Sequence, residues 1–292
     1  MDQLWTNLPP VTKAWSVSIA ATAALISTNR VKLINLIFVP DRAFGTQPWR
    51  LLTSFCCSEG LLMELLFELF LISGSCGRVE EIFSTKPALI PERLTDDFDQ
   101  RQWDILHRYV EKNRVIDFFY YIVQIAVSIV VSASILHYEL GLTIATLGAV
   151  LCRVLIYIDA QNNPHELINF MGFFTLRKSF YPWIEAMLTV FLNGGIAEDL
   201  AKLRDGNYGV LRNVLVWFYL MSIALGHFWW ATRDLLLSTV HYDGHDRRRE
   251  VKRDALKRYG VMKVDVVRES LAWLLLPPWY WIILPEIKTM RL

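Results

Sequence analysis

The chain has 292 residues, of which 53% are apolar and only 20% are charged. Its mean hydropathy of +0.30 is higher than an ordinary soluble domain tolerates, so we exclude a soluble protein built on a single core. Basic and acidic residues nearly balance, and the formal net charge of +1 gives no electrostatic reason to expect a nucleic-acid partner.

Six apolar segments follow one another along the chain. The hydrocarbon core of a bilayer is about 30 Å thick and needs roughly 20 apolar helical residues, and each segment comes near that length. We therefore predict an all-α polytopic membrane protein with six transmembrane helices. The predicted spans are residues 11–28, 51–76, 115–136, 140–158, 181–196 and 210–237.

Lysine and arginine are divided unequally between the two sides that six spans would define. The side of the N-terminus carries 21 of the 30 basic residues, and the other side carries seven. Because cytoplasmic loops hold the excess of positive charge, we predict that both termini are cytosolic. The N-terminus has no basic region followed by a small-residue cleavage site, so we expect the first apolar segment to direct insertion.

Two parts are predicted: a membrane domain at residues 1–237 and a basic cytosolic tail at residues 238–292. A charged cytosolic insertion at residues 84–114 interrupts the membrane domain, and its apolar residues fall at helical spacing. This pattern fits a helix lying on the bilayer surface as well as an ordinary solvated helix.

The tail contains two further features. Residues 245–259 are strongly basic. They would bind an anionic membrane leaflet or an acidic partner, or they would serve only to set the topology. Residues 271–284 contain Pro277-Pro278, which must break a continuous helix, and are rich in aromatic residues. We predict an interfacial segment there.

No metal, disulfide or cofactor site is expected. The four cysteines lie within apolar runs, without a Cys-x-x-Cys pair or a histidine at zinc-site spacing. They are Cys56, Cys57, Cys76 and Cys152.

Ionisable residues interrupt the predicted spans at Glu64, Glu68, Arg153, Glu185 and His227. A charge at the centre of a membrane helix costs about 2.5–3.5 kcal/mol, so such groups usually face the bundle interior, water or one another. Glu64 and Glu68 are one helical turn apart and share a face. One interpretation is that the two glutamates pair with Arg153 or lie near the membrane interface. The other is that they line a hydrated groove for a polar substrate, together with Arg153 and Glu185.

The fifth predicted span is short. Its strongly apolar part, residues 181–192, covers about 18 Å at 1.5 Å per residue, less than the hydrocarbon thickness. A helix of this length thins the bilayer around it or is shielded by its neighbours. We expect such a patch to lower the barrier for moving a polar chain through lipid.

Several short motifs occur in the order and spacing of one known family. A Pro9-Pro10-Val11-Thr12-Lys13 run precedes the first predicted span, and Trp49-Arg50 precedes the second. With these, the chain resembles the derlins, rhomboid-fold pseudoproteases of the endoplasmic reticulum membrane. Further matches are residues 63–65, 78–83, 114–121, 157–169 and 170–183, and the Gly226-His227 pair.

The resemblance implies a rhomboid-like bundle that assists retrotranslocation of misfolded proteins in endoplasmic-reticulum-associated degradation. It implies as partners misfolded client proteins, a ubiquitin-ligase membrane complex, a cytosolic AAA unfoldase and membrane lipids. In derlins the pair corresponding to Trp49-Arg50 supports the fold and the activity. The family's small-residue pattern in the sixth span is represented here by Ser222 and Gly226, which should still allow close helix approach.

The chain also departs from derlins. Residues 84–113 look like an insertion, and the loop around residues 199–213 is lengthened. The tail lacks the F-x-G-x-G-x-x-L type of box that recruits the valosin-containing ATPase in derlins that have it. The resemblance therefore implies that such an ATPase is engaged indirectly, through a partner or the basic tail.

Proteolysis is not expected. A rhomboid protease needs a serine on the fourth span within reach of a histidine on the sixth, because the imidazole takes the hydroxyl proton. His227 would supply the base, but Val150 stands where the nucleophile would fall, and residues 140–158 contain no serine. A buried thiol such as that of Cys152 is usually inert. We predict no catalytic residue and interpret His227 as a structural histidine.

Three alternatives remain open from sequence. A small-solute or lipid transporter would use the same polar interior, although no inverted repeat is visible. An active rhomboid-type protease would need His227 in a catalytic role. A protein of a plastid or another organelle could also have adopted the derlin scaffold.

Overall fold

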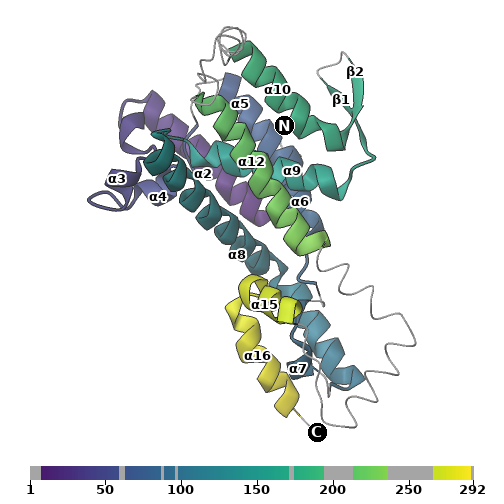
Figure 1. Cartoon of the computed structure of the whole chain (residues 1–292). Helices are drawn as coiled ribbons and strands as arrows, with labels where there is room; N and C mark the ends of the chain where they lie inside the picture. Colours follow the sequence, from purple (N-terminus) through teal and green to yellow (C-terminus); the bar gives the residue numbers. More distant parts are fainter. Residues whose placement is uncertain are drawn as a thin grey trace. The chain divides into compact units, whose positions relative to one another are not determined.

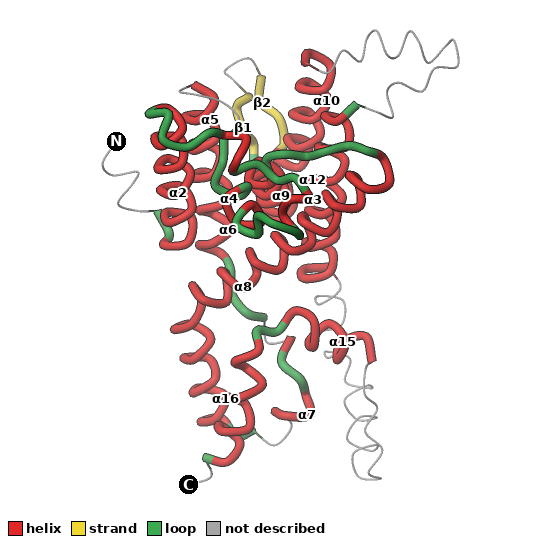
Figure 2. Tube along the Cα trace, turned by 90° about the vertical axis from the view of Figure 1, so that its left-hand side faces the viewer, coloured by secondary structure: helices red, strands yellow, loops and turns green. Residues whose placement is uncertain are grey.

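The computed structural model describes residues 8–58, 63–86, 89–95, 98–170, 174–193, 213–235 and 266–290. The chain forms two compact units, and nearly all of its described elements are helices (Figures 1 and 2). Unit 1 consists of Met1–Ile82 and Ile122–Phe228, and unit 2 of Phe83–Tyr121 and Trp229–Leu292.

Unit 1 begins with α2 (Pro10–Ser27), which confirms a helix at the first predicted span. A proline at the first helical position has no N–H to leave unpaired. Glu80 of α6 (Gly77–Ile82) is buried, and its carboxylate accepts the N–H groups of Val11 and Thr12 and the Thr12 hydroxyl at 2.7–2.9 Å. The negative charge also meets the positive end of the helix dipole. The motif at residues 9–13 thus joins the start of α2 to α6.

Replacement of Glu80 by glutamine should lower the free energy of unfolding by about 1.5–3 kcal/mol, because the hydrogen bonds lose their charged acceptor. Thermal unfolding of the purified protein in detergent, followed by circular dichroism, measures this change. The matched control is Glu81→Gln, since Glu81 is the exposed neighbour on the same helix. Equal melting temperatures for the two variants would contradict this role of Glu80.

The second predicted span is not one helix, so the prediction of a continuous helix over residues 51–76 is wrong. A short α4 (Arg50–Thr53) is followed by non-helical residues, and α5 (Met63–Leu71) continues through the π-helical turn η2 (Ile72–Cys76) into α6. The carbonyls of Ser54 and Phe55 accept hydrogen bonds from Gly148 N–H (3.0 Å) and Trp15 Nε1 (2.8 Å). These tertiary bonds replace the helical ones that would continue α4.

The third predicted span and the end of the insertion share one helix. This helix, α8 (Gln100–Leu140), has 41 residues and contains neither glycine nor proline. The part of the insertion from Gln100 onward is therefore not a separate helix, because nothing in the sequence ends the helix before the apolar stretch. Gly141 follows at φ 68°, a left-handed conformation that commonly ends helices.

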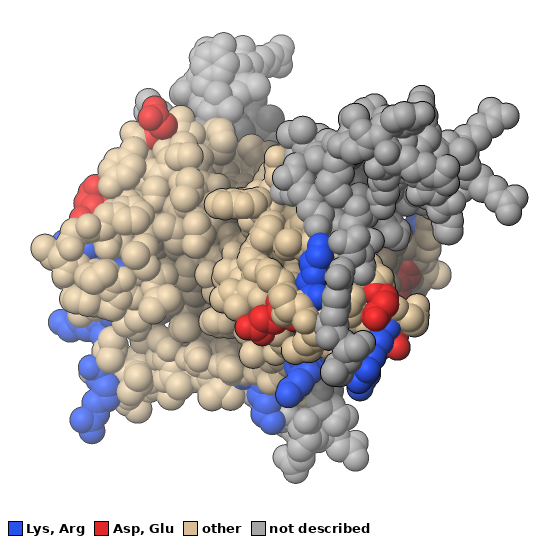
Figure 3. All heavy atoms as spheres, turned by 90° about the horizontal axis from the view of Figure 1, so that it is seen from below, with Lys and Arg blue, Asp and Glu red and all other residues tan. Residues whose placement is uncertain are grey.

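The apolar part of α8 has two contrasting stripes. Ile125, Ile129 and Ala133 are buried, whereas Val127 and Val131 are more than half exposed. On the face shown in Figure 3, wide areas of described surface carry neither basic nor acidic side chains. Exposed valines at helical spacing are expected where a helix contacts lipid.

Two helices of the described chain are long and apolar enough to cross a membrane. They are Gln100–Leu140 and Val214–Arg233, and the latter comprises α12 (Val214–Trp230) with part of the π-helical turn η6 (Ala231–Leu235). The number of six spans stays a prediction.

The fourth predicted span begins later than expected, because residues 141–146 are not helical and α9 runs from Leu147 to Asn162. Twelve of its 16 residues are buried, and it contacts α5, α6 and α10 (Tyr181–Asn193). It is thus the central helix of unit 1, and its side chains meet those of several other elements.

A β-hairpin separates α9 from α10, which the all-α prediction missed. Strand β1 (Leu167–Phe170) pairs antiparallel with β2 (Phe174–Arg177), with Leu167 opposite Arg177. A 3₁₀ turn, η4 (Lys178–Phe180), leads from β2 into α10.

Unit 2 brings the insertion and the tail together, although the sequence placed them in separate parts. It contains α7 (Glu92–Thr95), the first part of α8, η6, α15 (Val266–Leu275) and α16 (Pro278–Thr289). Asp117 of α8 is buried and accepts hydrogen bonds from Thr85, Trp279 Nε1 (2.9 Å) and the Tyr280 hydroxyl (2.6 Å). The predicted helix break at Pro277-Pro278 is confirmed, and residues 245–259 lie outside the described residues.

Candidate functional site

Two of the four candidate groove residues form an ion pair in the interior of unit 1. The Nη2 of Arg153 on α9 lies 3.4 Å from the Oε1 of Glu185 on α10, and the side chains are 21% and 12% exposed. The Arg153 guanidinium also lies over two rings of α12, at 5.5 Å from the Phe218 centroid and 5.9 Å from that of Tyr219. Three helices therefore meet around one cation.

The Arg153 guanidinium has more donors than this arrangement uses. Its Nη1 donates to the Ala149 carbonyl at 3.3 Å, whereas its buried Nε has no hydrogen-bond partner among the described residues. A buried N–H without a partner costs about 1–3 kcal/mol. An ordered water would satisfy this buried donor.

The other two candidates are not joined to this pair by any contact that the structure describes. Glu68 is half-buried on α5, and the side chain of Glu64 lies outside the described residues. The pairing of either glutamate with Arg153 stays a prediction, and so does a groove shared by all four.

The small residues of α12 permit a close approach to α9. Ser222 is buried and its hydroxyl donates to the Phe218 carbonyl at 2.7 Å. A Cβ atom at Gly226 would lie 2.7 Å from the Cβ of Tyr157 on α9, closer than two carbon atoms can come. Gly226 therefore allows contact that any larger residue would prevent.

His227 lies beside this contact and pairs with a tyrosine. Its Nδ1 is 3.0 Å from the Tyr157 hydroxyl, while Val150 and Cys152 are buried elsewhere in α9. Tyr157 could not be predicted as the partner, because a single tyrosine is common in an apolar span.

The Trp49-Arg50 pair fixes the loop between α2 and α4. Arg50 is fully buried; its Nη1 donates to the carbonyls of Ile34 and Ile37 at 2.8 Å, and its Nε donates to Gln47. Trp49 is half exposed. Arg50 thus holds the segment containing η1 (Leu33–Asn35) and α3 (Pro40–Ala43), as a buried arginine with carbonyl partners can.

A charged cluster at the end of α9 was missed by the sequence analysis. Lys178 Nζ lies 2.9 Å from Asp159 Oδ1 and 2.6 Å from Glu166 Oε2, and Arg78 Nη2 lies 2.9 Å from Asp159 Oδ2. Asp159 and Lys178 are buried. The cluster joins α6, α9, the hairpin and η4, so it determines where α10 begins. The available signal was an aspartate ending a buried apolar segment, which requires a nearby cation.

The stability of this cluster should depend on pH through Glu166. The hydrogen bond from Lys178 lowers the pKa of the Glu166 carboxyl, while partial burial opposes that effect and the charges of Lys178 and Arg78 lower the pKa further. A lowered folded-state pKa stabilises the protein above the unfolded value of about 4.3, and this contribution is lost as the pH falls through the folded value.

Glu166→Gln should therefore reduce the fall in melting temperature between about pH 5 and about pH 3. The effect is modest, because the Glu166 side chain is 43% exposed and solvent weakens the interaction. The control is Glu139→Gln, which removes an exposed carboxyl from the end of α8. Identical pH profiles for the wild type and Glu166→Gln would contradict the assignment.

The described part of the chain includes all four cysteines. It contains no group of three or more His, Cys, Asp or Glu residues that could hold a metal ion. Its four cysteines are unpaired.

The family model and the curated relatives that match this chain indicate the same family. The model of the Der1-like family matches residues 8–215. Derlin-2.1 of Zea mays is 20% identical over 213 residues, which cover 71% of this chain and 75% of that protein. Derlin-2.2 of Arabidopsis thaliana is 19% identical over 210 residues (71% and 76%), and Derlin-1.2 of Zea mays is 21% identical over 206 residues (70% and 72%). No solved structure matches the chain.

Proposed function

Because the chain belongs to the Der1-like family, we propose that it is a non-catalytic component of endoplasmic-reticulum-associated degradation. Membership of the family suggests a role in this pathway. The specific role proposed here is to assist retrotranslocation of misfolded proteins from the membrane or lumen of the endoplasmic reticulum to the cytosol.

The observation that carries the proposal is the Arg153–Glu185 pair between α9, α10 and α12. Charges in the interior of a membrane protein are costly and generally mark a path for polar material. A polypeptide backbone carries both acceptor and donor groups, which match the cation of Arg153 and the carboxylate of Glu185. Both ends of the peptide group therefore find a partner at this site.

Bilayer thinning would add to this effect. The strongly apolar part of α10 covers about 18 Å, against about 30 Å for the hydrocarbon core. Lipid that adapts to a short helix presents a thinner barrier beside the charged pair. The mechanism is thus physical: hydrated charges and thin lipid lower the free energy of a polar chain in transit.

The proposal includes six spans, both termini in the cytosol and residence in the endoplasmic reticulum membrane. The proposed partners are misfolded clients, a ubiquitin-ligase complex that selects them and a cytosolic AAA unfoldase that supplies force. Because the tail lacks the family's ATPase-binding box, the unfoldase would be engaged indirectly.

A non-catalytic role is supported by what surrounds His227. The histidine pairs with the Tyr157 hydroxyl, and residues 140–158 contain no serine. The histidine is thus paired with a phenol and not with the serine that a rhomboid-type triad needs.

The test is the half-life of a misfolded client in cells lacking their own derlins. Trp49→Ala/Arg50→Ala should lengthen the half-life at least about twofold, because the loop held by Arg50 loses its carbonyl contacts. Arg42→Ala, at an exposed arginine of α3, is the matched control. His227→Ala should give the same pattern of client fragments as the wild type. Loss of a discrete cleavage product in that variant would instead identify a protease.

A further inference from the structure

We propose that the bend between α15 and α16, residues 271–280, inserts into the boundary between the head groups and the acyl chains of the bilayer. We call this bend the elbow, and its lipid-contacting side chains are Trp273 and Leu274. The sequence predicts an interfacial segment over residues 271–284 but assigns neither its lipid-facing side nor its anchor on the rest of the protein. The inference goes beyond the proposed function, because it concerns how the membrane holds the tail and not how a client moves.

The end of α15 is apolar both on its buried side and on its exposed side. Ala272, Leu275 and Leu276 are buried, whereas Trp273 is 78% exposed and Leu274 is 56% exposed. At about 3.6 residues per turn, the two exposed side chains point away from the three buried ones. A helix that is apolar on all sides is stable inside a protein or in a membrane. The buried side is packed against protein, so the exposed side is expected to face lipid.

Asp117 of α8 anchors the elbow at the level where the predicted span begins. Trp279 Nε1 donates to Asp117 Oδ1 at 2.9 Å, and the Trp279 ring packs edge-on against Tyr120 with 5.5 Å between the centroids. Asp117 and Tyr120 lie two and five residues beyond residue 115, which corresponds to about 3 Å and 8 Å along the helix. Tryptophan and tyrosine are enriched at this boundary of the membrane. The anchor therefore sets the depth of the elbow.

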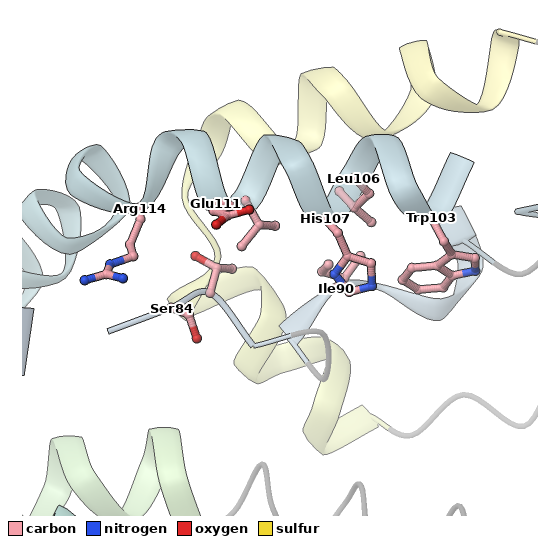
Figure 4. Close-up of a pocket in the computed structure, with 9 residues that line it drawn as sticks. Ser84, Ile90, Trp103, Leu106, His107, Glu111 and Arg114 are labelled. Atoms are coloured by element: carbon pink, nitrogen blue, oxygen red, sulfur yellow. The ribbon is translucent and has the colours of Figure 1, made fainter. Parts of the chain in front are cut away.

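The helix α16 leads away from that boundary. Beyond the contact at Asp117, the Ile287 carbonyl accepts a hydrogen bond from Gln102 Nε2 at 3.1 Å, so α16 runs antiparallel to the first part of α8. Figure 4 shows the yellow ribbon of α16 alongside the stretch of α8 that carries Trp103 to Arg114. Only the start of α16 reaches the level of the predicted span. Thr289, at the other end of α16, should therefore lie in water.

The surface of α8 beside the anchor supports lipid as the occupant. Ile116 and Phe119 are 54% and 57% exposed, and they flank the residues that hold Trp279. They begin the exposed apolar stripe that continues along α8 through Val127 and Val131. A bilayer covers this stripe and the elbow together, because both are apolar and both lie at the start of the span. A protein partner on the elbow would have to displace lipid at the same level.

Spin labels measure the depth of the elbow directly. The full-length protein carries Cys56→Ser, which removes the one of its four cysteines that is not buried, and is reconstituted in phosphatidylcholine vesicles. A nitroxide at Trp273→Cys or at Leu274→Cys should collide mainly with oxygen, at a depth of roughly 5–10 Å into the boundary. Thr289→Cys, at an exposed position of α16, is the matched control and should collide mainly with a water-soluble nickel chelate.

Two results would overturn the proposal. If the labels at residues 273 and 274 met the nickel chelate as often as the label at residue 289, the elbow would lie in water. If they met neither oxygen nor the chelate, protein would cover the elbow, such as a second copy of the chain. The Cys56→Ser protein without a new cysteine gives the background from the buried thiols, and circular dichroism establishes that each labelled variant is folded.

Discussion

Replacing Lys178 by methionine should lower the free energy of unfolding by about 3 kcal/mol, one of the two largest losses expected from a single substitution here. The lysine ammonium lies 2.9 Å from the fully buried Asp159, whose carboxylate would then depend on Arg78 alone. A buried carboxylate with too few partners pays a large desolvation cost. The remaining partner keeps the loss at the lower end of the range for broken buried pairs.

Thermal or denaturant unfolding in detergent measures this loss, with Arg177→Met as the matched control. Arg177 is exposed, so its replacement should change stability by less than about 0.5 kcal/mol. The double variant Lys178→Met/Asp159→Leu should recover part of the loss, because both buried charges are then gone. A Lys178→Met protein as stable as the Arg177→Met control would refute the role of the cluster.

Gly148→Ala should also destabilise the protein strongly. A Cβ atom at residue 148 would lie 2.5 Å from the Phe55 carbonyl oxygen and 3.0 Å from its carbon. Those atoms are backbone, and the oxygen is held by Trp15 Nε1 at 2.8 Å, so they cannot move cheaply. Overpacking of this kind costs about 1–3 kcal/mol, and the start of α9 would be displaced.

Gly74→Ala provides the control for this prediction. A Cβ atom at Gly74 would meet nothing within 4 Å, and alanine is favoured over glycine in a helix. Gly74→Ala should therefore leave the melting temperature unchanged or raise it. A Gly148→Ala variant that also melts at or above the wild-type temperature would show that the contact at Phe55 is not tight.

Features specified by local chemistry could be predicted from the sequence. The start of α2 at Pro10, the break at Pro277-Pro278 and the small residue at Gly226 each depend on properties of one or two residues. Proline lacks an N–H and glycine lacks a Cβ wherever they occur, so their consequences are readable without the fold.

Features that depend on residues far away in the chain could not be predicted from the sequence. The helix ends after α4 because the carbonyls of Ser54 and Phe55 bond to Gly148 and Trp15, which are far away in the chain. Hydropathy records the apolar character of the segment but not where its backbone groups find partners.

The candidate site divides in the same way. The cost of charge in lipid predicted that Arg153 and Glu185 would need partners, and the structure pairs them with each other. The spacing of the glutamates at 64 and 68 did not indicate how far α5 lies from that pair. The Asp159–Lys178 cluster could not be predicted, because a basic residue beside an apolar segment indicates the topology but not the residue with which it pairs.

The cluster and the ion pair are connected through the chain. Lys178 fixes η4, and α10 starts at Tyr181, directly after that turn. Glu185 lies in the second turn of α10, so the cluster determines where its carboxylate can meet Arg153. We expect variants of the cluster to impair client degradation only as far as they displace Glu185.

The central claim is that the charged pair lowers the barrier for a polar chain, and one measurement tests it most directly. The half-life of a misfolded client is compared among the wild type, Arg153→Leu/Glu185→Leu and Arg153→Glu/Glu185→Arg, each expressed at the same level in derlin-deficient cells. The leucine pair keeps the interior packed but removes the charge, so the half-life should lengthen at least about threefold. The variant with the swapped pair keeps polar groups at the site, so the client half-life in its presence should stay within about twofold of the wild-type value. A folded leucine-pair variant that degrades the client as fast as the wild type would contradict the account.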